Sequence, residues 1–188
     1  VDVIDVGQGL SVLVRTREHA LVFDSGARGR GGYDLGAVAV LPALRSRGVR
    51  HLDLLVTSHL DNDHAGGRDT MLRAFPKARE RVGIDADPAA RCIAGERWSW
   101  NGVSFRFLHP HRHFPDLGND SSCVLLVTAG AHRLLVPGDI GALIEDRLLA
   151  DPDARDLDVL VVPHHGSRHS SGAAFVAALR AWRLDPRR

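Results

Sequence analysis

The stretch SHLDNDHAGG, residues 58–67, follows the apolar run LDLLV, which is typical of a buried strand. Within six positions it contains two imidazoles and two carboxylates, those of His59, Asp61, Asp63 and His64. Such groups are costly next to a core unless they bind protons, partners or a metal ion. The stretch therefore predicts a polar site at the end of a buried strand.

Three other apolar runs also end in residues that can bind metal. ALVFD ends at Asp24, LLVPGD at Asp139, and VLVVPHH at His164 and His165. Buried strands bring their ends to a common edge of a sheet, where loops can direct side chains to one point. A single residue of this kind is more often a cap or a solvated loop residue, but four such runs predict one shared site.

A metal site explains this pattern. Histidine nitrogen and aspartate oxygen are ligands of zinc, manganese and iron. His59 and Asp61 are spaced to face one ion and Asp63 and His64 to face a second, with Asp139 arriving on a distant strand to bridge both. Two ions roughly 3.5–4 Å apart activate a water and stabilise the oxygens of an in-line displacement, as in phosphodiester chemistry.

The rest of the pattern predicts an α+β protein. Two strand-rich halves are expected to join near residue 95. The opening 26 residues predict three antiparallel strands. Strands are also expected at 51–59, 103–109, 122–130, 132–139 and, as one more buried strand, 157–166; helices are expected at 35–47, interrupted by Pro42, at 63–75 after a loop, at 141–150 and at 171–183.

The composition excludes several classes of protein. With 188 residues, 44% hydrophobic and 25% charged, the chain fits one soluble globular domain over residues 1–188. A formal net charge of +1 provides no overall basic field for nucleic acid, so such a partner must be held locally. No apolar run approaches the roughly 20 residues that span a bilayer. The chain begins at Val1 inside a strand-like pattern, so we expect a fragment of a longer chain.

The two cysteines, Cys92 and Cys123, are too few for a disulfide framework and too far apart for a paired zinc knuckle. Cys123 lies in SSCVLLV, where a small buried core residue is expected. The pattern assigns no role to Cys92.

With these residues in view, the sequence resembles the metallo-β-lactamase superfamily, whose signature is His-x-His-x-Asp-His followed by a late Asp and a late His. HLDNDH matches it with Asp61 in place of the second His. This exchange makes the first site harder and more anionic, which favours manganese without excluding zinc. The family's middle histidine has no clear counterpart. Candidates are His109, His111, His113, Asn119 and Asp120, and we favour the NDSS segment that contains the last two.

The blocks DVGQGLSVLV, SHLDNDHAGG, GNDSSCVLL, LLVPGDI and VPHHGSRHSS occur in the order seen in the β-lactamase-like domain of ComEC-type DNA-internalisation competence proteins. They extend over nearly the entire chain. The resemblance implies a four-layer αβ/βα sandwich, with two mixed β-sheets flanked by helices and the site at one edge between them.

The resemblance also implies roles for individual residues. Which of His164 and His165 binds metal stays open; the other would contact substrate or protonate the leaving group. Asp63 and His165 are the expected catalytic residues, and Asp24 is the expected supporting carboxylate. The implied metal ligands are His59, Asp61, Asp63, His64, Asp139 and His164, Asn119 and Asp120 are possible ligands or supports, and the implied substrate contacts are Ser167, Arg168 and Ser170.

By this resemblance, the expected function is a metal-dependent nuclease that hydrolyses phosphodiester bonds of single-stranded DNA with two divalent ions, manganese or zinc. It would degrade the non-transported strand during natural transformation, beside a transmembrane channel part of the same longer chain and the DNA-uptake machinery. The domain would lie on the periplasmic or extracellular face of an inner membrane protein. The alternatives are a metallo-hydrolase of a small ester or phosphoester and a catalytically degenerate, DNA-guiding scaffold. Arg28, Arg30, Arg112 and Arg168 flank the site motifs as a local basic surface.

Overall fold

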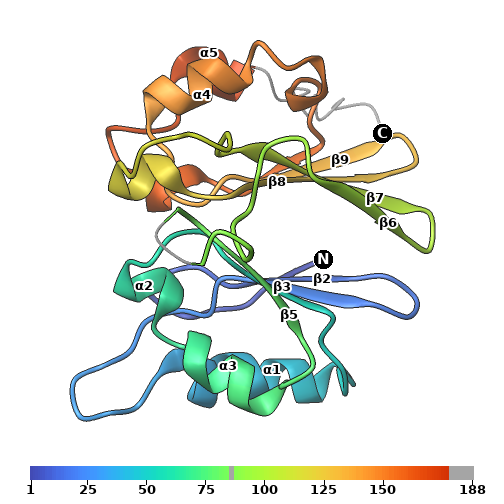
Figure 1. The fold of residues 1–188 in the computed structure, drawn as a ribbon, viewed down its shortest axis with the longest axis vertical. Coiled ribbons are helices and arrows are strands. Elements are labelled where there is room, and N and C mark those ends of the chain that lie inside the picture. The colour runs from blue at the N-terminus through green and yellow to red at the C-terminus, as the bar shows by residue number, and fades with distance from the viewer. Residues whose placement is uncertain (85–86, 178–188) are drawn as a thin grey trace, which may run out of the picture.

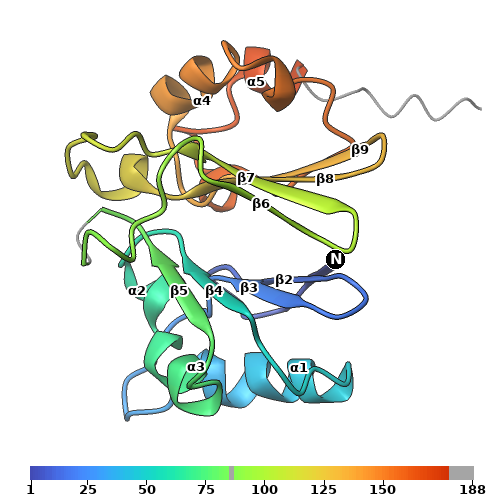
Figure 2. The ribbon, with the colours of Figure 1, turned by 45° about the vertical axis from the view of Figure 1, so that its right-hand side comes forward.

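The computed structural model describes residues 1–84 and 87–177. Two five-stranded sheets lie face to face, and helices cover the outer face of each sheet (Figures 1 and 2). This arrangement confirms the expected four-layer αβ/βα sandwich with two mixed sheets. The connection between the sheets runs from residue 83 to residue 96, which confirms the expected join near residue 95.

The first sheet has the strand order β1-β2-β3-β4-β5. The three opening strands pair antiparallel as predicted, whereas β3, β4 and β5 run parallel. The elements of this half are β1 (Asp2–Val3), β2 (Val12–Arg15), β3 (Ala20–Phe23), the π-helical turn η1 (Gly36–Val40), α1 (Leu41–Ser46), β4 (Leu54–Thr57), α2 (Asn62–Ala65), α3 (Arg68–Ala74) and β5 (Arg79–Val82).

The second sheet has the order β10-β9-β8-β7-β6, antiparallel except for β10, which runs parallel to β9. The elements of this half are β6 (Arg97–Trp100), β7 (Val103–His109), the 3-10 turn η2 (Gly118–Ser121), β8 (Val124–Ala129), β9 (His132–Val136), α4 (Ala142–Leu148), the 3-10 turn η3 (Pro152–Ala154), β10 (Val159–Leu160), the 3-10 turn η4 (Pro163–Gly166) and α5 (Ala173–Ala177).

The central strand β4 shows why the apolar runs are continuous. Leu54 and Val56 belong to the core between the two sheets, whereas Leu55 belongs to the core under α1 and α3. Side chains alternate along a strand, so a strand that is covered on both faces is apolar at every position. The first polar residues after β4 therefore emerge at the end of the sandwich, between its two sheets.

Several expected elements differ from those observed. Residues 35–46 of the expected helix 35–47 are helical, but the helix changes from η1 to α1 next to Pro42, which stands in the first turn of α1. The expected buried strand at 157–166 is wrong: β10 contains only two residues at a sheet edge, and Val159 and Val162 are 54% and 57% exposed. Of the helix expected at 171–183, the structure describes 173–177, and its end lies outside the described residues.

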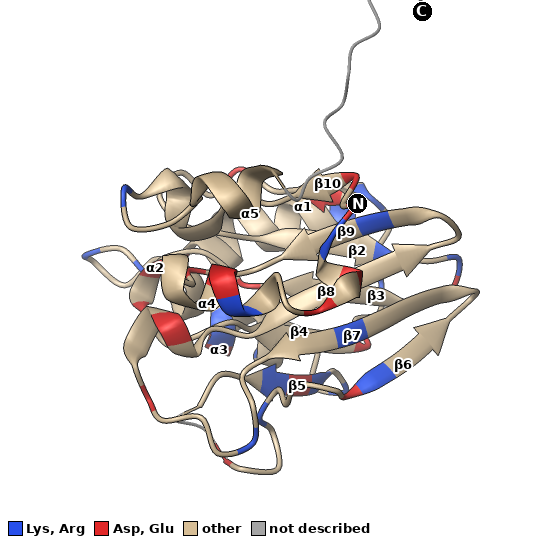
Figure 3. Ribbon diagram, turned by 90° about the horizontal axis from the view of Figure 1, so that it is seen from above, with Lys and Arg blue, Asp and Glu red and all other residues tan. Residues whose placement is uncertain are grey.

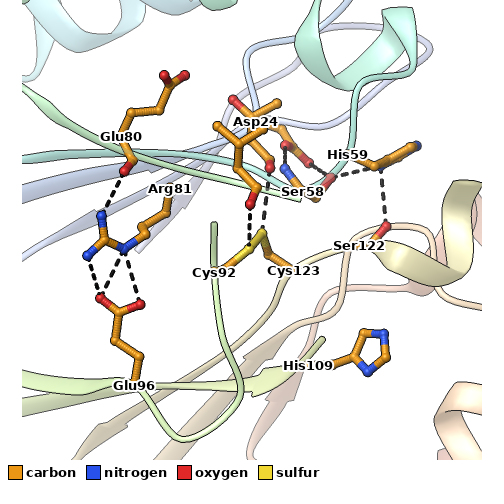
Figure 4. Close-up of a disulfide and its surroundings, with 12 residues drawn as sticks. Asp24, Ser58, His59, Glu80, Arg81, Cys92, Glu96, His109, Ser122 and Cys123 are labelled. Carbon is orange, nitrogen blue, oxygen red and sulfur yellow. Dashed lines mark hydrogen bonds and ion pairs between the residues drawn. A yellow bond between two sulfur atoms is a disulfide. The ribbon is translucent and has the colours of Figure 1, made fainter. Parts of the chain in front are cut away.

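A disulfide joins Cys92, in the connection between the sheets, to Cys123, directly before β8 (Figure 4). Both residues are buried, which confirms the expectation for Cys123, and their Cα atoms lie 6.0 Å apart. Arg81 and Glu96 form an ion pair of 2.7 Å across the same connection. The disulfide therefore attaches the connection to the second sheet, and the ion pair attaches it to β5 of the first sheet.

Over residues 1–84 and 87–177, the helices are too short to cross a membrane. Charged residues of both signs are interspersed along the ribbon (Figure 3).

Candidate metal site

His64 lies at the centre of the site, where the chain leaves β4 and enters α2. Its side chain is fully buried. The Nδ1 atom lies 2.7 Å from Asp24 Oδ2, and the Nε2 atom lies 3.1 Å from Asp139 Oδ1. Asp24 directly follows β3 and Asp139 lies shortly after β9, so side chains from both sheets meet at this imidazole.

Asp63 and His165 complete a group of four with His64 and Asp139, which we call the Asp63 cluster. One possible ligand atom from each residue lies within 4.8 Å of those of the others. His165 Nε2 lies 3.3 Å from Asp63 Oδ2, 3.5 Å from Asp139 Oδ2 and 3.2 Å from His64 Nε2. These residues come from three places in the sequence, and tertiary packing brings them together.

His59 lies on the other side of this cluster, with ring centroids of His59 and His64 4.3 Å apart. Its Nδ1 atom lies 3.0 Å from Ser58 Oγ and 3.3 Å from Ser122 Oγ (Figure 4). Within the described part of the chain, its buried Nε2 atom has no hydrogen-bond partner, and the largely exposed Asp61 carboxylate lies 3.6 Å away. A buried ring nitrogen that is directed toward a carboxylate and lacks a hydrogen bond suits a metal ion.

His164 and His165 point in different directions although they are neighbours in η4. Both have left-handed backbone conformations, with φ values of 49° and 51°. His164 Nε2 lies 3.2 Å from Asn119 Nδ2 and 4.0 Å from Asp139 Oδ2. His165, which the sequence analysis treated as catalytic, therefore lies inside the Asp63 cluster, whereas His164, treated as a ligand, lies at its edge beside Asn119.

The remaining expected site residues are farther from the cluster or are engaged elsewhere. Asp120 Oδ1 accepts a hydrogen bond of 2.7 Å from the Gly141 amide, so this carboxylate supports the loop after Asp139. Ser170 is buried, and its hydroxyl lies 3.0 Å from the carbonyls of Pro163 and Ser167. Ser167 is half-buried, and Arg168 is exposed.

None of the three histidines considered for the missing middle ligand joins the Asp63 cluster. His109 is buried, and its Nε2 atom donates a hydrogen bond of 2.8 Å to the Asp120 carbonyl. Burial lowers the pKa of His109 to about 4. His111 and His113 are exposed.

Two supports of the site were not identified in the sequence. Gly9, with φ +132°, lies so close to Asp63 that a Cβ atom there would overlap the Asp63 carbonyl. This contact explains the second glycine of the GQG motif, and the Leu10 amide donates a hydrogen bond to the same carbonyl. Glu145 is fully buried on α4, and its two oxygens accept from the amides of Ser171 and Gly172, which fixes the segment after η4.

The electrostatics of the cluster favour a cation. Burial alone would lower the pKa of His64, but the Asp24 and Asp139 carboxylates outweigh it and raise this pKa to about 10. Burial tends to raise the pKa of Asp139, but contact with His64 holds it below its usual value. Burial lowers the pKa of His59. The carboxylates thus stabilise positive charge at the position where the ligand atoms converge.

The residues present fit a divalent metal ion. Two carboxylates and two imidazoles form a hard-to-borderline donor set of the kind that binds manganese or zinc. The Asp24 carboxylate holds the far nitrogen of His64, as carboxylates commonly do for metal-binding histidines. The cluster therefore suits a divalent metal ion.

Comparisons with known proteins agree with this geometry. The model of the metallo-β-lactamase superfamily matches residues 4–186. The solved structure of the MIM-2 metallo-β-lactamase has a TM-score of 0.62 at 17% identity, over 91% of this chain and 79% of that one, and so shares the fold. The chain belongs to the metallo-β-lactamase superfamily.

Two curated relatives are similar over almost the whole chain. Competence protein ComA of Neisseria gonorrhoeae is 40% identical over 181 residues, which cover 95% of this chain and 25% of the relative. Recombination protein 2 of Haemophilus influenzae is 36% identical over 184 residues, which cover 96% of this chain and 23% of the relative. The expected resemblance to ComEC-type competence proteins is confirmed, and the chain spans about a quarter of the length of these relatives.

Proposed function

We propose that this domain is a metal-dependent phosphodiesterase that hydrolyses single-stranded DNA during natural transformation, on the strand that is not transported. The observation that carries the proposal is the Asp63 cluster, whose four ligand atoms lie within 4.8 Å of one another at the end of the sandwich. The similarity to a competence protein supports a role in DNA uptake.

In this proposal, His64, Asp63, Asp139 and His165 would hold one divalent ion, manganese or zinc. His59 and Asp61 would hold a second ion. Bound ions supply Lewis acidity, which activates water and neutralises charge on phosphate oxygens. Asp24 and Ser58 keep His64 oriented, because Asp24 Oδ2 contacts His64 Nδ1 while both Asp24 oxygens accept hydrogen bonds from Ser58.

His164 is the proposed proton donor to the leaving group. Its Nε2 atom lies outside the Asp63 cluster and accepts a hydrogen bond of 3.2 Å from Asn119 Nδ2, so a substrate oxygen would replace Asn119 at this nitrogen before the protonated ring donates. This assignment exchanges the roles that the sequence analysis gave to His164 and His165, and the reason is the shorter distance of His165 to Asp139, 3.5 Å against 4.0 Å.

Substrate phosphates would be held by exposed groups around the cluster. Ser167 and Arg168 follow η4 directly. Arg28 is fixed beside α2, because its amide donates to Asn62 Oδ1 at 3.1 Å and its carbonyl accepts from Asn62 Nδ2 at 3.1 Å. Arg30 is exposed on the same loop. These residues supply a local positive surface to a chain of net charge +1.

We also propose that the domain acts outside the cytoplasm, beside a membrane channel formed by another part of the same longer protein. The Cys92–Cys123 disulfide supports an oxidising compartment such as the periplasm or the cell exterior. The competence relatives, of which this chain covers about a quarter, support the link to DNA-uptake machinery.

The test is to replace Asp63 by Asn and to measure both bound metal and cleavage of end-labelled single-stranded DNA after manganese or zinc is supplied. We expect the variant to lose one bound ion per chain and cleavage to fall at least ~100-fold, because a charged ligand becomes neutral. Glu18→Gln is the matched control, since Glu18 lies in the exposed turn between β2 and β3 at the opposite end of the sandwich (Figure 1).

Cleavage by Asp63→Asn at the rate of the parent would refute the proposed site. A parent protein that binds no metal and does not cut DNA would instead favour the DNA-guiding scaffold. Hydrolysis of small esters without cleavage of DNA would favour a small-ester hydrolase.

A further inference from the structure

A second hollow opens beside the metal site, on the outer side of the loop that leads into η2. It is a cavity of about 700 Å³, within the usual range for ligand pockets, which is roughly 300–1,000 Å³. Its lining includes the side chains that define what we call the arginine–histidine pocket: His111, Arg112, His113, Phe114, Leu117 and Arg147.

The pocket shares a wall with the metal site. Leu117 lines the pocket and Asn119 contacts His164, and two residues of chain span at most roughly 7 Å. The Leu117 amide donates a hydrogen bond of 2.7 Å to Ser121 Oγ, which fixes the start of η2. Arg147 reaches the pocket from α4, the helix that follows Asp139. A chain bound at the metal site therefore has the pocket as its neighbour.

The back of the pocket is supported by buried structure. Phe114 packs edge-on against His109, with ring centroids 4.5 Å apart. His109 is in turn hydrogen-bonded to the Asp120 carbonyl of η2. Because burial lowers the pKa of His109 to about 4, the ring behind Phe114 is neutral at pH 7. Phe114 thus presents a supported aromatic surface beside cationic side chains.

The charge of the pocket is positive. Arg112 and Arg147 are exposed and permanently charged, and none of the described lining residues is acidic. Two acidic residues adjoin the lining residues in sequence: Asp116, which accepts a hydrogen bond of 3.0 Å from the Gly118 amide, and Asp146, which is exposed on α4. Cations beside an aromatic and an aliphatic surface are the combination that binds single-stranded nucleic acid, in which phosphates need cations and bases need a flat apolar contact.

We propose that the arginine–histidine pocket binds a nucleotide of single-stranded DNA next to the phosphate at the metal centre. This proposal rests on the proposed nuclease function and adds the site that holds the strand. Arg112 and Arg147 bind the backbone phosphate, and the base lies against Phe114 and Leu117.

The test measures binding of a fluorescein-labelled single-stranded oligonucleotide by anisotropy, in EDTA so that no strand is cut. The variants are Arg112→Gln and Arg147→Gln. The control is Arg17→Gln, because Arg17 is 78% exposed in the distant turn between β2 and β3. We expect each pocket variant to weaken binding about five- to tenfold and to reduce the slope of log affinity against log salt by about 0.7, the value for one lost phosphate contact.

Phe114→Leu tests the base contact separately. It keeps an apolar side chain over His109 but removes the aromatic face, so binding should weaken about fivefold or more with no change in the salt slope. Three results would each contradict the proposed pocket. Both arginine variants could bind the oligonucleotide as tightly as the parent, Arg17→Gln could weaken binding as much as the pocket variants do, or the pocket variants could lose the same affinity for double-stranded DNA.

Hydrolysis of bis(p-nitrophenyl) phosphate by the parent with manganese distinguishes this proposal from the nuclease function. If the parent hydrolyses this small diester but the Arg112 and Arg147 variants bind DNA as tightly as the parent, the pocket proposal is wrong and the phosphodiesterase proposal is retained. No hydrolysis together with DNA binding that depends on both arginines would overturn the nuclease and leave the pocket as a DNA-binding site.

Discussion

The two sides of Asp139 are built differently. On one side, His64, Asp63 and His165 bring their ligand atoms within 4.8 Å of each other and of Asp139. On the other side, His59 presents one buried nitrogen, and the neighbouring Asp61 carboxylate is 63% exposed and 3.6 Å away. The Asp63 cluster therefore has enough donor atoms close together to hold one ion, whereas the His59 side has fewer donors in fixed positions.

The groups that hold the two histidines in place also differ, and His64 again has the stronger partner. His64 is held by the Asp24 carboxylate, which is buried and receives hydrogen bonds from Ser58. Among the residues that the structure describes, the partners of His59 Nδ1 are the hydroxyls of Ser58 and Ser122. A carboxylate increases the basicity of a metal-binding imidazole more than a hydroxyl does. The comparison therefore leads us to expect that the Asp63 cluster binds metal more tightly than the His59 side.

Removal of the disulfide should have the largest effect on stability. The Cys92→Ser/Cys123→Ser variant should lose about 3 to 4 kcal/mol of unfolding free energy, the value expected for a crosslink across 31 residues. Cys123 directly follows Ser122, whose hydroxyl contacts His59. In this variant the His59 side should therefore lose its ion before the Asp63 cluster does. Urea unfolding and metal titration measure the two effects.

A reducing agent should destabilise the parent but leave the double serine variant unchanged. If the parent unfolds at the same urea concentration with and without reductant, the disulfide does not stabilise the fold.

Replacement of the supporting groups tests the comparison itself. Asp24→Asn should weaken the tighter metal site about 10- to 100-fold. Asn is a suitable replacement because it tolerates the left-handed backbone of Asp24, whose φ is 60°. Ser122→Ala should weaken only the looser site, and by less than about tenfold, because Ser58 still contacts His59. Competition with a metal chelator measures both affinities, and equal losses at one site would contradict the difference between the two sides.

Lowering the pH should reduce the unfolding free energy through His109, which is hydrogen-bonded to the Asp120 carbonyl next to Asn119. Burial lowers the pKa of His109 to about 4 from the ordinary 6.5, so the unfolded chain binds more protons between these values. The stabilising contribution is therefore complete above pH 6.5 and is lost as pH falls toward 4. Between pH 7 and pH 5, the parent should lose about 2 kcal/mol through this group.

The matched control is His109→Gln, which does not titrate. Unfolding in urea at pH 7 and pH 5 should show a smaller pH dependence for this variant than for the parent. Identical pH dependence of the two proteins would show that His109 is not the group responsible.

Much of the fold was predictable because its strands are strongly patterned. The apolar runs before Asp24, His59 and Asp139 are buried on both faces, so their continuous hydrophobicity identifies them without knowledge of their partners. β5 and β6, with the sequences RERV and RWSW, were not predicted. They are edge strands, one with three consecutive charged residues and the other with tryptophans at alternate positions, and such short patterns carry little information by themselves.

The sequence by itself determined most of the strands and the set of polar strand ends, because hydrophobic periodicity and residue type are local properties, and its resemblance to a known family implied the four-layer architecture. Only the tertiary structure decided that His165, and not His164, lies within the Asp63 cluster, since the two share a left-handed turn and differ only in direction. It also decided the Cys92–Cys123 pair, the support of Asp63 by Gly9 and the anchoring of η4 by Glu145. Each of these contacts joins residues that are distant in sequence, and only tertiary packing brings them together.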